Sequence, residues 1–172
     1  VYGAEFEIRK NFGFFGDKWQ DFSFNLNFSL IKSSLEMTDA ELERRTLNLR
    51  EGETLEDSRE MQGQSPYLVN FGLNYANDKG WQTSLYYNVQ GKTLQVVGTG
   101  DVPDAYTMPF HSLDFILNKS FGEEQRSNIS FSVKNLLDST LEAKYQSFKA
   151  EDQIFSSLSP GTGISLGYTY KF

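Results

Sequence analysis

The chain contains 172 residues, carries a net charge of −7 and has no cysteine. An acidic chain offers no basic face for phosphate, which argues against nucleic acid as a partner, and the lack of cysteine excludes disulfides and thiolate metal sites. Aromatic residues reach 15% while hydrophobic residues total only 38%, and no run of about 18 apolar residues predicts a transmembrane helix.

Apolar residues recur at every second position in seven segments, which predicts seven β-strands. In chain order these segments are 2–9, 22–30, 67–75, 81–90, 112–121, 128–134 and 164–172. The intervening positions are mostly Asn, Ser, Gly or charged residues, so each strand has one apolar and one polar face. The segments are close to the length of about 9–11 residues with which a tilted strand crosses a bilayer.

The connections between these segments alternate strictly between short and long. The short ones are 11–20, 77–80 and 122–127, and the long ones are 32–64, 91–110 and 138–162. Outer-membrane barrels show this asymmetry, with short periplasmic turns and long extracellular loops, whereas a Greek-key sandwich is not expected to sort its connections by length. The pattern predicts an all-β fold, an antiparallel transmembrane β-barrel.

Seven antiparallel strands do not close into an up-and-down barrel. The two edges would leave backbone groups unpaired in hydrocarbon, where water cannot satisfy them. We therefore expect residues 1–172 to form the C-terminal part of a larger barrel, with earlier strands outside this sequence.

The last predicted strand ends the chain in an aromatic residue. Tyr168, Tyr170 and Phe172 alternate with polar residues, and this end resembles the C-terminal assembly signal of Gram-negative outer-membrane proteins, in which a terminal Phe and an aromatic residue two positions earlier are typical. The resemblance implies recognition by the barrel assembly machinery. With the long loops outside, the last strand runs inward, so Phe172 is expected at the periplasmic face.

Two further stretches resemble one family. Residues 62–75, Gln-Gly-Gln-Ser-Pro-Tyr-Leu-Val-Asn-Phe-Gly-Leu-Asn-Tyr, are similar to a stretch of TonB-dependent receptors of the Bacteroidetes type. Asn135-Leu136-Leu137-Asp138 matches the NLLD element that follows the penultimate strand in many of these receptors. The resemblance covers most of residues 59–172, whereas residues 1–58 match only as barrel wall.

This resemblance implies a transporter of the outer membrane and no enzyme or cofactor. Its barrel would have about 22 strands around an N-terminal plug, and it would import a siderophore, cobalamin, glycan or peptide with energy from TonB. The implied partners are outer-membrane lipid, the plug, TonB and, in the sugar-importing branch, a surface lipoprotein. An alternative is a receptor-like barrel that has lost import and serves as a structural subunit of a larger outer-membrane complex.

Five charged residues fall on the polar faces of the predicted strands and are expected to line the lumen: Glu5, Glu7, Arg9, Asp114 and Lys134. There they would contact the plug or, as an alternative, a ligand. His111 is the only histidine. Because a catalytic base needs a nucleophile and an orienting partner, and zinc needs more ligands than one, we interpret His111 as a residue of the barrel rim.

The most acidic stretch is 36–60, in which carboxylates alternate with arginines. Several carboxylates are typical of a Ca²⁺ site, but the arginines favour a solvated extracellular loop. Within it, 38–49 is predicted to form one or two helical turns capped by Asp39. The glycine pairs at 98 and 100 and at 161 and 163 lack the strand-to-helix context of a phosphate-binding loop.

Overall fold

The computed structural model describes residues 1–99 and 101–172. Gly100, one of the glycines considered for a phosphate-binding loop, lies outside the described residues.

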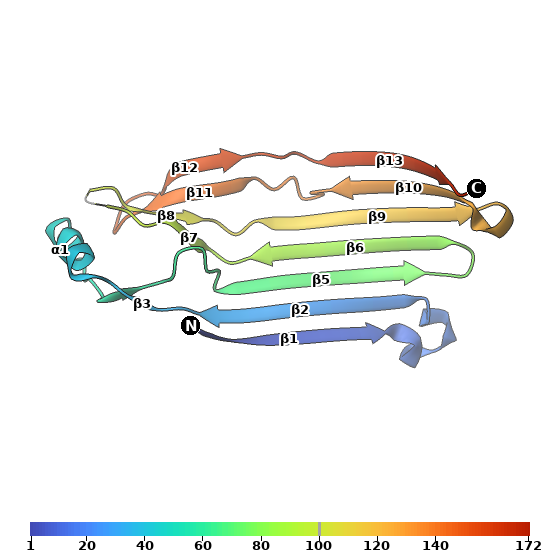
Figure 1. Ribbon diagram of the computed structural model, residues 1–172, viewed down its shortest axis with the longest axis horizontal. Helices are drawn as coiled ribbons and strands as arrows, with labels where there is room; N and C mark the ends of the chain where they lie inside the picture. The colour runs from blue at the N-terminus through green and yellow to red at the C-terminus, as the bar shows by residue number, and fades with distance from the viewer. Residues whose placement is uncertain (100) are drawn as a thin grey trace.

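Seven antiparallel strands form one sheet in the order β1-β2-β5-β6-β9-β10-β13 (Figure 1). Their bounds are β1 Tyr2–Asn11, β2 Phe22–Lys32, β5 Tyr67–Ala76, β6 Trp81–Gln90, β9 His111–Phe121, β10 Ser127–Lys134 and β13 Gly163–Tyr170. All seven predicted strands are confirmed. β10 and β13 have 8 residues each, fewer than the roughly 9–11 residues with which a tilted strand crosses a bilayer.

The three short connections lie at one end of this sheet, together with the C-terminus (Figure 1). The first contains the 3₁₀ turns η1 Phe12–Phe15 and η2 Asp17–Trp19, and the third contains η3 Glu123–Gln125. The second is a tight turn in which Asn77 N donates to Trp81 O at 3.0 Å. Gly80 has a φ of +80°, and a Cβ there would collide with the carbonyl of Ser120, so glycine is required where this turn meets β9.

The three long connections contain regular structure that the sequence did not predict. A four-stranded sheet has the order β12-β11-β8-β7, with bounds β7 Thr93–Val96, β8 Asp104–Thr107, β11 Leu141–Gln146 and β12 Gln153–Leu158. A second, two-stranded ladder pairs β3 Leu35–Glu36 with β4 Ser58–Arg59. These strands are too short to show a clear alternation. β7 with β8 and β11 with β12 are pairings within one connection, whereas the pairing of β8 with β11 joins the second long connection to the third.

The predicted helical turns are confirmed as α1, Asp39–Leu47, but the expected cap is wrong. Thr38 is the N-cap, and its Oγ1 accepts a hydrogen bond from Glu41 N at 3.3 Å. Asp39 is the first helical residue. A carboxylate in the first turn and Arg44 and Arg45 in the last turn both suit the helix dipole.

Strand register sorts the side chains of the seven-stranded sheet onto two faces. Phe24 pairs with Leu73, Leu73 with Leu85, and Leu85 with Phe115. The same parity continues to the last strand through the pairs Phe115 with Val133 and Val133 with Ile164. One face is therefore apolar across all seven strands, and the other, the polar face, consists mainly of Asn, Ser and Gly.

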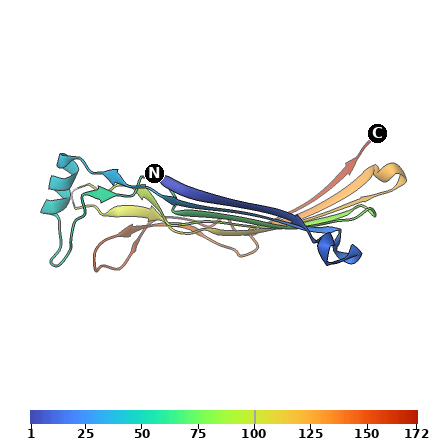
Figure 2. The same cartoon turned by 90° about the horizontal axis from the view of Figure 1, so that it is seen from below.

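Very little of the molecule forms a buried core. The buried hydrophobic residues are Val89, Leu94, Ala105 and Ala143, and three of these lie in the four-stranded sheet. The seven-stranded sheet is a single curved layer (Figure 2), and on its apolar face Phe6 is 60% exposed and Leu166 76% exposed. Within the described part of the chain, no helix combines the length and hydropathy needed to cross a membrane.

Candidate functional site

Short amide and hydroxyl side chains bond to one another across the polar face. Asn74 lies at the centre of one group: its Nδ2 donates to Asn25 Oδ1 at 3.2 Å, and its Oδ1 accepts from Ser84 Oγ at 2.9 Å and Tyr86 Oη at 3.1 Å. Further along the same face, Asn88 Nδ2 donates to Asn70 Oδ1 at 2.6 Å. In these two groups the polar face is made of neutral side chains that form hydrogen bonds with one another. The same side chains can also form hydrogen bonds with water or a polar ligand.

The five residues predicted to line the lumen all lie on this polar face, but they do not form one site. Three are on β1, where Arg9 Nε lies 2.5 Å from Glu7 Oε1 and Glu5 accepts from Ser29 Oγ at 3.4 Å. Lys134 ends β10, opposite Gly163. The three residues of β1 are separated from Asp114 on β9 by β2, β5 and β6, whereas β10, which Lys134 ends, pairs with β9. Asp114 has a structural partner of its own.

Asp114 binds the turn that follows β10. Its Oδ1 accepts from the backbone N of Asn135 at 2.9 Å. Asn135 is 7% exposed and has a φ of 53°. Its side chain holds the base of the last long connection, since Nδ2 donates to Ser139 O and Gly161 O, each at 3.1 Å, and Oδ1 accepts from Ser139 N at 3.0 Å.

This geometry gives the Asn135–Asp138 motif a physical role that the sequence did not reveal. An Asn tolerates the left-handed conformation and has a donor and an acceptor on one short side chain. The Asn135 side chain therefore joins the two ends of the connection between β10 and β13, because it binds Ser139 at the start and Gly161 at the end.

An ionic cluster joins the long connections at the other end of the molecule. Arg45 of α1 lies between two carboxylates: its Nη2 is 2.9 Å from Asp104 Oδ1 of β8, and its Nε is 3.5 Å from Glu41 Oε1. Glu41 also binds Arg59 Nε at 2.7 Å, and Asp104 accepts from Gly98 N at 2.7 Å. The four side chains are 15–24% exposed, so solvent screens these pairs less than it screens pairs on an open surface.

Two groups in this cluster have shifted pKa values. Burial lowers the pKa of Arg45, but the hydrogen bonds and negative charges of Asp104 and Glu41 outweigh it, and the pKa lies above its ordinary value. Burial raises the pKa of Tyr106 on β8, and the charges of Asp104 and Glu60 raise it further. Arg45 therefore stays charged and Tyr106 stays neutral at any physiological pH.

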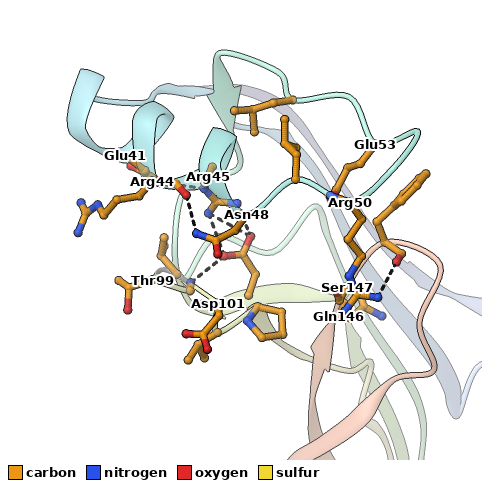
Figure 3. Close-up of a pocket in the computed structure, with 18 residues that line it drawn as sticks. Glu41, Arg44, Arg45, Asn48, Arg50, Glu53, Thr99, Asp101, Gln146 and Ser147 are labelled. Atoms are coloured by element: carbon orange, nitrogen blue, oxygen red, sulfur yellow. Dashed lines mark hydrogen bonds and ion pairs between the residues drawn. The ribbon is translucent and has the colours of Figure 1, made fainter.

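A hollow of about 470 Å³ lies beside this cluster, between α1, residues 97–99 and 101–104, and the tip of the β11–β12 hairpin (Figure 3). Its wall is strongly polar and includes Arg44, Asn48, Asp101 and Gln146. Arg50 closes one side, where its Nη1 donates to Phe148 O at 3.1 Å. The hollow presents both charge signs, so it suits a polar ligand with several hydrogen-bonding groups.

Among the described residues, Glu41 is the one carboxylate of the acidic stretch that forms ion pairs, with Arg45 and Arg59. The backbone N of Arg50 donates a hydrogen bond to Glu53 Oε2 at 3.0 Å. Among residues 1–99 and 101–172, no group of three or more His, Asp or Glu side chains is placed to hold a metal ion. His111 begins β9 at the end of the long connections, and its Nδ1 lies 2.7 Å from Tyr87 Oη.

Sequence reasoning did not find Arg45 and Asp104 as partners. They are 59 positions apart, and their pairing depends on the four-stranded sheet. Comparison with protein-family models, curated proteins and solved structures found no match to this chain.

We expect Asn135→Ala to lower the free energy of unfolding by about 2 kcal/mol, because it leaves three partly buried backbone groups without their partner. It should also speed protease cleavage between 139 and 162. Asp138→Ala is the matched control: Asp138 also has a left-handed φ, of 50°, but its side chain makes no hydrogen bond within the described residues. Equal effects of the two substitutions would contradict the role of the Asn135 side chain.

Arg45→Ala and Asp104→Ala should be non-additive, with a coupling free energy of about 1–2 kcal/mol in a double-mutant cycle. The coupling is obtained from the rate of protease cleavage in the segment 48–57, measured for the wild type, the two single variants and the double variant. The control cycle pairs Arg44→Ala with Asp104→Ala, because Arg44 Nε donates to Ala40 O instead. Additive behaviour in the Arg45 cycle would show that the ion pair does not hold α1 on β8.

Proposed function

We propose that this chain is part of the wall of an outer-membrane transport β-barrel and contributes three extracellular loops. The supporting observation is the single-layer sheet whose apolar face is uncovered across seven strands. Contiguous apolar surface of this extent is rare on a protein surrounded by water, where it marks a membrane or protein interface. An alternation of apolar-out and polar-in residues is the pattern of barrels whose outer side meets lipid.

The sheet edges favour a larger closed structure. β1 and β13 are each paired on one side only, and in hydrocarbon an unpaired row of backbone N–H and C=O groups costs several kcal/mol per group. Under this proposal both edges pair with further strands of the same barrel, so that residues 1–172 form its C-terminal wall. The resemblance to TonB-dependent receptors supports a total of about 22 strands.

Orientation follows from the two ends of the sheet. The end with the short turns faces the periplasm, and the long connections, with α1 and the four-stranded sheet, face the exterior. Tyr168 and Tyr170 lie on the apolar face of β13, and the rings of Tyr170 and Phe172 meet edge to face with centroids 5.2 Å apart. These three aromatic residues would serve as the signal that the barrel assembly machinery reads.

Import is the proposed activity, energised by TonB through a plug. The polar face would line the lumen, where Glu5, Glu7, Arg9, Asp114 and Lys134 contact the plug or a ligand, and the polar hollow beside Arg45 would be exposed to the exterior. The ligand classes that the resemblance supports are siderophores, cobalamin, glycans and peptides. A surface lipoprotein is a further proposed partner at the loops.

Leu85→Asp tests the membrane-spanning sheet, because Leu85 lies on the apolar face in the middle of β6. A carboxylate there should destabilise the barrel by about 2 kcal/mol and lower the heat-modifiable, folded fraction in outer-membrane extracts. Ser84→Asp is the control, since Ser84 lies one position away on the polar face. Tolerance of Leu85→Asp, or a larger loss with Ser84→Asp, would contradict the assignment of the faces.

Uptake assays test the transport activity. Cells that lack this protein should lose uptake of one probe among a labelled ferric siderophore, cobalamin, an oligosaccharide and a peptide pool, and a protonophore should abolish the same uptake in wild-type cells. A folded outer-membrane barrel whose loss leaves all four uptake rates unchanged would refute import and support the structural subunit instead.

A further inference from the structure

The charged residues on the apolar face of the seven-stranded sheet are all lysines. Strand parity places Lys10, Lys32 and Lys119 on this face, whereas the carboxylates of the seven strands, Glu5, Glu7 and Asp114, are on the polar face. The chain as a whole has a net charge of −7. The cations on the apolar face are therefore not a reflection of a basic composition.

The lysines stand at the two ends of the apolar face. Lys10 on β1 pairs with Phe24, and Lys32 is eight positions further along β2. Eight residues of strand span about 27 Å, or about 20 Å at the usual strand tilt, which is close to the height of the apolar band of an outer-membrane barrel, about 25 Å. Lys119 lies at the same end as Lys10, where it pairs with Trp81.

Lys119 is held against an aromatic ring and keeps free donors. Its Nζ lies 4.8 Å from the centroid of the Trp81 ring and donates one proton to Lys79 O at 2.5 Å. An ammonium has three donors, so two remain. No carboxylate among the described residues lies within 4.0 Å of this Nζ, and Glu124 in the neighbouring turn is bound by Arg126.

Lys10 repeats this arrangement on β1. Its Nζ lies 5.4 Å from the centroid of Phe14, a residue of η1 that is 60% exposed beside Phe15, which is 68% exposed. Phe12 of the same turn stacks on Phe24 of the apolar face, with centroids 5.4 Å apart. The turn thus extends the apolar face with exposed rings and places an ammonium among them.

We infer that Lys10 and Lys119 bind the phosphate groups of anionic phospholipids at the short-turn rim of the membrane. This inference rests on the proposed membrane-spanning sheet and adds the chemistry of the lipid. Aromatic rings lie at the depth of the lipid headgroups. An ammonium group among them is therefore at the depth of the phosphates, which it binds as a point charge. A headgroup with a net negative charge is preferred over a zwitterionic one, because the latter brings its own cation.

Tryptophan fluorescence tests this inference. Trp81, beside Lys119, is the reporter, and its signal is the difference in fluorescence between the complete barrel and its Trp81→Phe variant. The complete barrel is folded into vesicles of phosphatidylcholine with a minor fraction of phosphatidylglycerol, and the bromine quencher is placed on one lipid in one sample and on the other lipid in a second sample. Trp81 should be quenched by brominated phosphatidylglycerol about five-fold more than its mole fraction predicts, the factor expected for one lysine at an anionic surface.

Lys119→Gln should abolish this enrichment and leave quenching by the zwitterionic lipid unchanged. Lys171→Gln is the control, since Lys171 is at the same end but alternates away from Tyr170 and the apolar face. Equal quenching per mole by both lipids in the wild type, or equal effects of the two substitutions, would overturn the inference and leave the membrane-spanning sheet intact. If neither brominated lipid quenched Trp81, this result would instead refute the membrane-spanning sheet itself.

Discussion

Strand register is the constraint on which the rest of this structure depends. Side chains alternate with a period of two, so a slip of one residue at any pairing would turn a whole strand's apolar set to the polar face. Six consecutive antiparallel pairings keep the parity from β1 to β13 without a bulge. The turn at Asn77 helps to fix it, because Asn77 Oδ1 accepts from both Lys79 N and Trp81 N at 3.1 Å and Ser120 N donates to Gly80 O at 2.8 Å.

The two faces created by this register are stabilised in different ways. On the polar face the partners are within the chain: Asn and Ser side chains bond across strands, as Ser132 and Ser165 do at 2.7 Å. On the apolar face large side chains remain exposed, so the hydrophobic free energy of folding is not recovered inside the described residues. Within the described residues, the backbone ladder and the polar face therefore define the sheet. In the proposed barrel, lipid on the apolar face would supply the remaining stability.

The sequence predicted the seven-stranded sheet because its signals are local. Alternation within β6 is visible in ten adjacent residues, and the turn at Asn77 has its own signature. The four-stranded sheet was missed because β7 and β8 have only 4 residues each and because the pairing of β8 with β11 joins two different long connections. The N-cap is Thr38, one residue before the predicted Asp39, and an error of one residue is common at helix ends. Arg45 and Asp104 had no sequence signal at all, and the Asn135 motif was recognised without its function in holding the loop base.

The seven-stranded sheet and the long connections are joined by hydrogen bonds. Asp114 lies inside β9 and holds Asn135, which in turn holds the base of the connection that contains β11 and β12. The first long connection is bound to the second, where Gly63 N donates to Leu94 O at 2.9 Å and Gln62 Nε2 to Gln95 O at 2.6 Å, and to the third through Arg50 and Phe148. Ordering a flexible loop on binding costs free energy for each immobilised side chain. Because these three connections are already ordered against one another, a ligand at the hollow beside Arg45 would meet a surface whose shape exists before binding.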